Sequence, residues 1–192
     1  MRILIHDYAG HPFQVELSRE LARRGWQVMH VYSASTLTPH GDLTRRKSDP
    51  LTFDVRPITL SRTIRKYRFF ERLWLESAYA QKLVEFCGTF QPDVVLSANS
   101  PSIVQHKLSR HCRGQGVRLV SWVQDLYGMA AYKILKRRIP IIGHLVGQYF
   151  MWLDRRVLRR SDAVVVISED FEKLLAGWGV DARAEPVDSR PL

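Results

Sequence analysis

The sequence predicts an α/β fold with a doubly wound, mainly parallel Rossmann-like sheet and helices on both of its faces. Short apolar runs rich in β-branched residues recur along the chain, as expected for strands that are buried on both faces. Amphipathic stretches with helical spacing separate these runs. Strands that alternate with helices are joined by right-handed crossovers, so we expect about six or seven strands in an order resembling 3-2-1-4-5-6.

Each element has its own signal in the sequence. After the first apolar run, Phe13, Leu17 and Leu21 recur at a spacing of four, and Gly25 marks the end of that helix. Pro101 is placed to begin a later helix. The third strand is the weakest prediction and has Pro57 near its end. We expect strands at residues 2–6, 26–32, 51–60, 93–98, 117–123 and 162–168, and further helices at residues 62–86, 101–112, 126–136 and 169–177.

The chain is long enough to bury one full hydrophobic core. Its 192 residues are 45% apolar and 25% charged, which favours one domain over two very small ones. We expect that domain to span residues 1–180, and residues 181–192 to be a polar tail or a truncated interdomain linker. The long polar connection at residues 33–50 has a length that in compact domains usually serves a function or is mobile.

The composition of the chain limits the kinds of partner that we expect. The chain has 29 Lys and Arg against 19 Asp and Glu, a net charge of +10, which favours phosphorylated ligands, anionic lipid or nucleic acid. No nucleic-acid-binding motif is visible, so we do not expect nucleic acid. Cys87 and Cys112 share no short motif and fit reduced thiols of a cytosolic protein, and no metal-ligand spacing is present. The longest apolar segment, residues 139–153, contains His144 and is short for a bilayer span, so we expect a soluble or peripheral protein.

The polar segment HDYAGHP, residues 6–12, joins the first strand to the first helix. Gly10 lets the chain turn tightly, and Pro12 suits the first turn of a helix. Ligands of doubly wound sheets bind beyond the carboxyl ends of the strands, where N–H groups of helix starts face anions. Gly10 and His11 are therefore candidate substrate-binding residues, although a plain strand-to-helix turn would use the same residues. A dinucleotide site is not expected, because its fingerprint needs three glycines where this segment has one.

Three other strand ends fall on the same edge of the predicted sheet. They read SANSPS (97–102), WVQDLYG (122–128) and VISED (166–170). Because the carboxyl ends of parallel strands meet at one edge, we expect their polar side chains to form one cleft with Gly10 and His11. The candidates from these strand ends are Asn99, Ser100, Gln124, Asp125, Ser168 and Glu169.

Asp125 is the candidate catalytic residue. It follows an apolar strand and could accept a proton, orient a hydroxyl or bind a cation. It fits equally well as the N-cap of the helix expected near residues 126–136. Ser168, followed by Glu169 and Asp170, fits a helix start, and there the structural role is favoured.

These segments, in this order and spacing, resemble the N-terminal half of a GT-B glycosyltransferase of the family 4 type. They are similar in particular to the bacterial exopolysaccharide and colanic-acid-type transferases. The resemblance covers nearly all of residues 1–180. It rests on MRILIHDYAGHPFQVELSRELARRGWQVMHVYSAS, QPDVVLSANSPS, WVQDLYG and LDRRVLRRSDAVVVISEDFEKLLAGWGV. In that family the N-terminal Rossmann-like domain binds the acceptor, the C-terminal one binds the nucleotide-sugar donor, and transfer with retention occurs between them.

The resemblance assigns roles to the first turn and to the fifth strand. Gly10 and His11 match the glycine-containing loop near the donor phosphates and the acceptor, with Ala9 where relatives often have a second glycine. Gln124 and Asp125 match the polar pair, often His-containing in relatives, that faces the reacting sugar. The resemblance thus implies that Asp125 orients the acceptor or acts as general base.

The remaining candidates also have counterparts in the family. Ser168 and Glu169 match the serine and the acidic residue that open the next helix, while His11 and Asn99 are expected to contact substrate. Acceptor choice is expected to lie in residues 33–50 and 126–140.

The implied function is that of the acceptor-side domain of a retaining glycosyltransferase. The nucleotide-sugar would be a co-substrate, no cofactor or metal is expected, and the acceptor would be a lipid-linked sugar or a polysaccharide. Donor binding would come from a missing C-terminal domain or a partner chain, so the chain alone is expected to be inactive. The alternative is a noncatalytic binding or membrane-recruiting subunit of a split glycosyltransferase.

Two stretches, residues 62–79 and 132–160, mix Arg and Lys with aromatic and aliphatic residues. A basic amphipathic helix of this kind can lie on an anionic membrane surface. The resemblance to enzymes with lipid-linked acceptors favours this interpretation, and with it a cytoplasmic protein attached peripherally to the inner membrane face. The alternative is a packed aromatic core with a solvated charged face.

Overall fold

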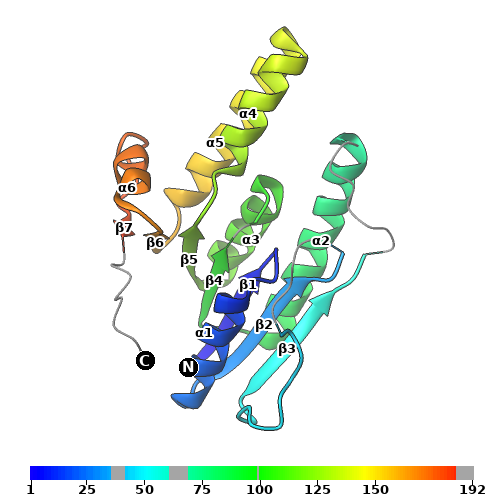
Figure 1. Ribbon diagram of the computed structural model, residues 1–192, viewed down its shortest axis with the longest axis vertical. Coiled ribbons are helices and arrows are strands. Elements are labelled where there is room, and N and C mark those ends of the chain that lie inside the picture. The colour runs from blue at the N-terminus through cyan, green and yellow to red at the C-terminus, as the bar shows by residue number, and fades with distance from the viewer. Residues whose placement is uncertain (36–41, 61–68, 99, 185–192) are drawn as a thin grey trace.

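The computed structural model describes residues 1–35, 42–60, 69–98 and 100–184. At its centre is a seven-stranded sheet in the order β3-β2-β1-β4-β5-β6-β7 (Figure 1). Every neighbouring pair of strands is parallel, which confirms the predicted doubly wound sheet and its 3-2-1-4-5-6 order, extended by one short strand. The strands are β1 (Arg2–Asp7), β2 (Gln27–Ser33), β3 (Phe53–Ile58), β4 (Val94–Ala98), β5 (Arg118–Val123), β6 (Ala163–Val166) and β7 (Arg183–Ala184).

The helices follow the predicted positions closely. The stretch expected at residues 62–86 is a helix that runs on to Phe90, although residues 61–68 lie outside the described part of the chain. The apolar segment around residues 139–153 forms a long helix that pairs with the one before it. The helices of the described residues are α1 (Pro12–Arg23), α2 (Phe69–Phe90), α3 (Ser102–Gln115), α4 (Tyr127–Arg138), α5 (Pro140–Leu158) and α6 (Glu169–Ala176).

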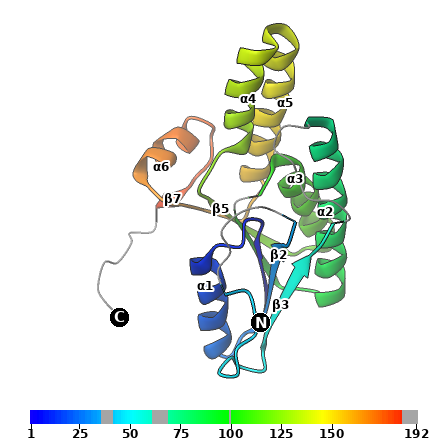
Figure 2. The same cartoon turned by 45° about the vertical axis from the view of Figure 1, so that its right-hand side comes forward.

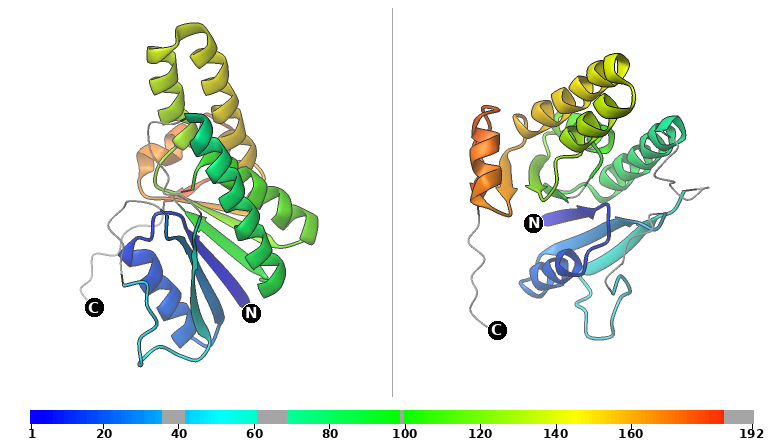
Figure 3. Two further views of the ribbon diagram at one scale, coloured as in Figure 1. Left: turned by 90° about the vertical axis from the view of Figure 1, so that its right-hand side faces the viewer. Right: turned by 45° about the horizontal axis from the view of Figure 1, so that its top comes forward.

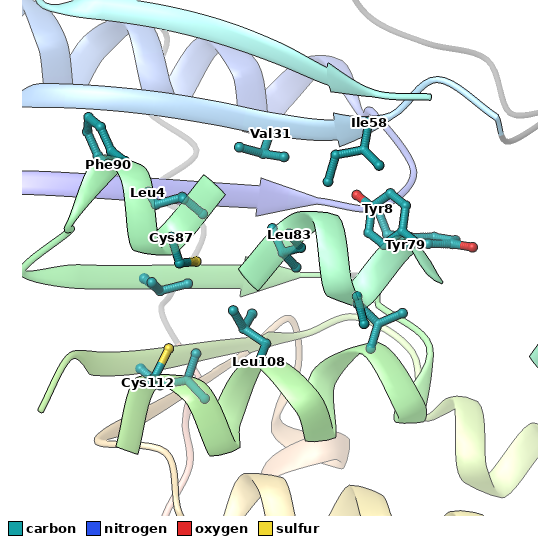
Figure 4. Close-up of a cluster of buried hydrophobic side chains, with 14 of the residues drawn as sticks. Leu4, Tyr8, Val31, Ile58, Tyr79, Leu83, Cys87, Phe90, Leu108 and Cys112 are labelled. Carbon is teal, nitrogen blue, oxygen red and sulfur yellow. The ribbon is translucent and has the colours of Figure 1, made fainter. Parts of the chain in front are cut away.

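Helices cover both faces of the sheet, as the apolar strands require. Successive residues of a strand point to opposite faces, and Leu4 and Ile5 of β1 accordingly belong to different buried clusters. Ile5 packs in the cluster that includes Val15 of α1, while Leu4 packs with side chains of α2 and α3. Figure 3 shows α1 on one face of the sheet and α2 and α3 on the other. Figure 4 shows this second cluster, in which Cys87 and Cys112 are buried free thiols.

The described part of the long connection between β2 and β3 is tied to α1. The guanidinium of Arg19 is fully buried, and its Nε donates to Asp49 Oδ1 over 3.1 Å. Its terminal amino groups also reach the carbonyls of Asp42 and Thr44, at 2.9 and 2.8 Å. Residues 42–49 are therefore held by a buried ion pair and backbone contacts, whereas residues 36–41 lie outside the described residues.

Helices α4 and α5 form an antiparallel hairpin that projects from the carboxyl edge of the sheet (Figures 1 and 2). Two glycines of α5 let the helices touch backbone to backbone. A Cβ at Gly143 would lie 2.1 Å from the carbonyl oxygen of Leu135, and one at Gly147 would lie 2.6 Å from Cα of Tyr132. The sequence of the hairpin thus specifies a close helix pair beside the strand ends where the candidate residues lie.

Candidate functional site at the carboxyl edge of the sheet

The turn between β1 and α1 is organised by Asp7, the last residue of β1. Its side chain is fully buried, and the N–H of Ala9 donates to Oδ1 over 3.0 Å while the N–H of His11 donates to Oδ2. Gly10 adopts a φ of 75°, a left-handed conformation that favours glycine. Burial raises the pKa of Asp7, and the hydrogen bonds from His11, Ala9 and Gly10 act in the opposite direction.

This carboxylate occupies the place at which the sequence predicts an external anion. The backbone N–H groups of the turn point at Asp7, so they serve an internal negative charge. Gly10 has a clear structural role, and Pro12 begins the helix as predicted. The side chain of His11 is 39% exposed, with Nδ1 3.6 Å from Asp7 Oδ1.

The first turn is connected to the end of β5. Gln14 is fully buried, and its amide is best assigned with the nitrogen 3.2 Å from Asp7 Oδ2 and the oxygen 3.1 Å from Gln124 Nε2. The ring of Phe13 also meets the ring of Trp122 edge to face, with centroids 5.6 Å apart. The structure therefore brings Gln124 to the Gly10–His11 turn, and it gives Gln124 a structural contact there.

A small cavity lies between the ends of β4 and β5. Its volume is about 40 Å³, and Ser100, Gln105, Asp125 and Asp154 are among the side chains that line it. Ser100 is buried, and its hydroxyl makes no hydrogen bond within the described residues. A buried hydroxyl without a partner costs free energy, which suits a site completed by a water or a ligand hydroxyl.

Asp125 lies exposed at the rim of this cavity. Helix α4 begins at Tyr127, and Leu126 occupies the N-cap position without a side-chain cap. The N-cap alternative for Asp125 is therefore wrong. The carboxylate is not needed to begin the helix, and it lines the same cavity as Ser100.

Asp154 of α5 supports this cavity, and sequence reasoning missed it. The carboxylate is buried, and the N–H of Gly128 donates to its Oδ2 over 2.7 Å. Burial raises the pKa of Asp154 to about 6, against the hydrogen bonds from Ser102 and Gly128. Asp154 thus links α5 to the first turns of α3 and α4. The one signal in the sequence was an acidic residue within an otherwise apolar and basic segment.

A buried histidine network supports the cavity from below. His6 Nδ1 lies 2.8 Å from the Ser97 hydroxyl, and Nε2 lies 3.0 Å from the Tyr79 hydroxyl. Ser97 in turn donates to Gln105 Oε1 over 2.7 Å, and Gln105 lines the cavity. Burial lowers the pKa of His6 to about 3, so the ring is neutral and serves as a fixed hydrogen-bonding element.

The candidates after β6 stand apart from this cavity. Ser168 occupies the N-cap position of α6 with extended backbone, but its hydroxyl makes no cap hydrogen bond, contrary to the favoured prediction. Glu169 and Asp170 lie exposed in the first turn, where acidic groups stabilise a helix. Ser168 and Glu169 share the sheet edge with Asp125 without lining the Ser100 cavity. Asn99 lies outside the described residues.

A larger groove opens at the same edge, between the start of α2 and the α4–α5 hairpin. Its volume is about 330 Å³. It reaches from Ser102 and Tyr127 at the sheet edge to Ile134 and Arg138 near the end of α4. Over the described ranges, no group of three His, Cys, Asp or Glu side chains could hold a metal ion.

Solved structures share this fold at low sequence identity. Sucrose-phosphate synthase from Thermosynechococcus elongatus is 14% identical with a TM-score of 0.62, over 99% of this chain and 91% of that one. Os79 from O. sativa, in complex with UDP, is 19% identical with a TM-score of 0.57, over 100% of this chain and 52% of that one. UGT73P12 from Glycyrrhiza uralensis, complexed with glycyrrhetinic acid 3-O-monoglucuronide, is 10% identical with a TM-score of 0.59, over 97% and 49%. The chain thus has the Rossmann-like fold of one half of a GT-B protein, and it spans about half the length of the latter two proteins.

The sequence itself places the chain within a family. The profile of the glycosyl transferase 4-like domain matches residues 11–188. The chain belongs to this family of glycosyltransferase domains, as the resemblance of its motifs implied. No curated protein matches the chain in sequence. The similarity to exopolysaccharide and colanic-acid-type transferases stays a prediction.

Proposed function

We propose that the chain is the acceptor-binding domain of a retaining glycosyltransferase, which transfers a sugar from a nucleotide-sugar to a lipid-linked or polysaccharide acceptor. The observation that carries the proposal is the position of Asp125. It is an exposed carboxylate at the carboxyl edge of a glycosyltransferase-family sheet and is not used as the N-cap of the helix that follows. It lines the same cavity as Ser100, whose hydroxyl makes no hydrogen bond within the described residues.

In the proposed reaction, Asp125 accepts a hydrogen bond from the acceptor hydroxyl and orients it toward the anomeric carbon of the donor. The new glycosidic bond forms as the bond from the anomeric carbon to the phosphate oxygen breaks. With retention, the hydroxyl enters on the face from which the diphosphate leaves, so its proton passes either to the leaving phosphate or to Asp125. The side chains of His11 and Asn99 are proposed as substrate contacts, with Ser100 at the cavity below.

The donor site is proposed to lie on a second domain or a partner chain. The Asp7 carboxylate already takes the backbone N–H groups of the first turn, which leaves them unsuited to a donor phosphate. Os79, a protein with the same fold, was solved with UDP, which supports a nucleotide as the leaving group. The nucleotide-sugar is then a co-substrate, and the chain alone is proposed to be inactive.

Attachment to an anionic membrane is proposed through residues 132–160, which form most of the α4–α5 hairpin. In the described part of the chain, every helix is too short or too polar to cross a bilayer. The second basic stretch, residues 62–79, is described only in part. Exposed isoleucines on the hairpin also favour the second candidate function, a noncatalytic membrane-recruiting subunit. A location on the cytoplasmic side of the membrane is part of the proposal.

The test is a transfer assay with a donor-binding half supplied as a co-expressed chain. We expect Asp125→Asn to lower kcat by about 100-fold or more, the typical contribution of a positioned acid–base group. Asp181→Asn, an exposed acid just before β7 at the opposite edge of the sheet, is the matched control. Unchanged transfer in Asp125→Asn would remove this residue from the mechanism.

Membrane recruitment of the donor half without any transfer would favour the second function. Calorimetry with nucleotide-sugars on the chain alone should show no micromolar binding.

A further inference from the structure

The tip of the α4–α5 hairpin carries a cluster of exposed aliphatic side chains. Ile141 is 81% exposed, Leu145 67% and Ile142 63%, next to Ile139 at 51%. Soluble proteins rarely leave such a cluster in water. The C-terminal end of α4 adds positive charge around it, with Lys133, Lys136, Arg137 and Arg138. Aliphatic groups ringed by cations suit the boundary between anionic headgroups and hydrocarbon.

The groove beside α4 connects this tip with the sheet edge. Tyr127 and Arg138, the first and last residues of α4, both line it, so it runs about 16 Å along the helix at 1.5 Å per residue. Its volume of about 330 Å³ lies within the usual range of small-molecule pockets, about 300–1,000 Å³. The groove is therefore large enough for part of an extended hydrocarbon chain.

The lining changes character along the groove. The middle is apolar, with Ala131, Ile134 and Leu135 of α4 facing Leu73 of α2. Polar groups gather at the sheet edge, where Arg72, Glu76, Ser102 and Tyr127 line the groove. Such a lining matches an amphiphile whose polar head lies at the edge and whose apolar chain lies along the helix.

Arg72 is placed to hold an anionic head. Its Nε donates to Glu76 Oε1 over 2.6 Å, and this fixes a side chain that has five N–H donors in all. A guanidinium forms strong, charge-assisted hydrogen bonds with a phosphate.

We propose that this groove binds the hydrocarbon chain of a phosphate-linked lipid acceptor, with the phosphate near Arg72 and the chain leaving at the aliphatic tip of the hairpin. The inference rests on the proposed function, because it assigns a lipid class to the acceptor of the same site. It places the acceptor sugar toward Asp125 and the far end of the chain in the bilayer, so that one hairpin serves membrane contact and substrate entry.

The test measures binding of dodecyl phosphate, below its micelle concentration, to the full chain by calorimetry. Methyl phosphate is the chain-free control and should bind far more weakly. Ala131→Trp fills the apolar middle of the groove, and losing about two buried methylenes corresponds to about tenfold weaker binding of dodecyl phosphate. Ala176→Trp, at the exposed end of α6, is the matched control and should bind as the wild type does. Circular dichroism of both variants checks that they fold.

A second measurement needs no variant. With isoleucine methyl groups labelled for NMR, dodecyl phosphate should shift Ile134 in the groove and leave Ile5 in the core unchanged. Shifts at Ile141 and Ile142 without one at Ile134 would show that lipid meets only the tip, and would overturn the proposal. Equal affinity for methyl and dodecyl phosphate, or an Ala131→Trp variant that is folded and binds normally, would overturn it as well. None of these assays uses a nucleotide-sugar donor. The proposal of lipid binding in the groove can therefore be wrong while the transfer assay succeeds, and it can be right while the transfer assay fails.

Discussion

The turns after β1 and after β5 lie at the same edge of the sheet, and each is held by a buried carboxylate. In the first turn the carboxylate is Asp7, at the end of the same strand, and it binds the N–H groups of Ala9 and His11. In the second it is Asp154, which reaches the N–H of Gly128 from α5, 26 residues further along the chain. Only the second turn has an additional acid of its own, Asp125, which is left exposed.

The difference shows what makes a polar strand end available for chemistry. In the first turn, the acid is Asp7 at the end of β1, and it is buried and accepts hydrogen bonds from backbone N–H groups. The side chain of His11 is partly exposed at this turn. In the second turn, Asp154 of α5 supplies the structural carboxylate, and the local acid, Asp125, stays exposed. Burial and hydrogen-bond partners decide between the two roles, and neither is visible in the local sequence.

The largest effect that follows from this comparison is on stability. We expect Asp7→Ala to lower the free energy of unfolding by about 2–5 kcal/mol, because it leaves at least two buried N–H groups without an acceptor, at about 1–3 kcal/mol each. Asp125→Ala should change it by no more than about 0.5 kcal/mol, as is usual for exposed residues. Urea unfolding of the two variants measures both values. Similar losses in both would mean that the two acids do not divide the structural and functional roles as described.

The next prediction concerns the effect of pH on stability through the ionisation of Asp154. Burial raises its pKa from 3.8 to about 6, so the folded protein resists the ionisation of this group. Its ionisation therefore costs stability as pH rises from about 4 to 7, by about 3 kcal/mol for a shift of about two units. Buried His6 and His30, with pKa values lowered to about 3, act in the opposite direction and cost stability as pH falls below 6.5.

Asp154→Asn isolates this contribution. Asn keeps an oxygen that can accept the Gly128 N–H, while the histidine contribution is common to both proteins. The stability of the variant relative to the wild type should therefore increase by about 2–3 kcal/mol between about pH 4 and pH 7. Denaturant titrations at a series of pH values give this difference directly. A difference that stays constant with pH would mean that Asp154 ionises freely in the folded protein.

The fold was predictable because its signals are local and repeated. Apolar runs such as residues 93–98 and 117–123 are strands in the structure, with ends moved by a residue or two. Parallel strands buried on both faces leave few other arrangements. The hairpin was harder, because a segment such as residues 139–153 is apolar enough for a core, yet several of its side chains are exposed.

The site was predictable only in part, for a physical reason. Strand order brings Gln124 and Asp125 to the same edge as His11, and that much follows from topology. Which acid is buried depends on contacts across the fold, and Asp154 and Asp7 were missed for this reason. At Ser168 the local sequence suggested a role that the structure does not show. Serine is a favoured N-cap residue, yet the Ser168 hydroxyl makes no capping hydrogen bond at the start of α6.

The smallest effect tests whether the second turn depends on its remote support. A Cβ at Gly147 would lie 2.6 Å from Cα of Tyr132, so Gly147→Ala must push α4 and α5 apart. Overpacking of this kind costs about 1–3 kcal/mol. In contrast, Gly114→Ala in α3 meets nothing within 4 Å and should stabilise the protein by up to about 1 kcal/mol through helix propensity.

Hydrogen exchange then shows which part of the structure Gly147→Ala destabilises. If α5 holds the second turn through Asp154, the amide of Gly128 should exchange faster in this variant, because loosening the hairpin loosens its acceptor. The amides of Ala9 and His11 should keep their protection, since Asp7 holds them from within β1. Equal acceleration at both turns would indicate that the domain opens as one unit. In that case the contrast between a locally held and a remotely held turn would not extend to their dynamics.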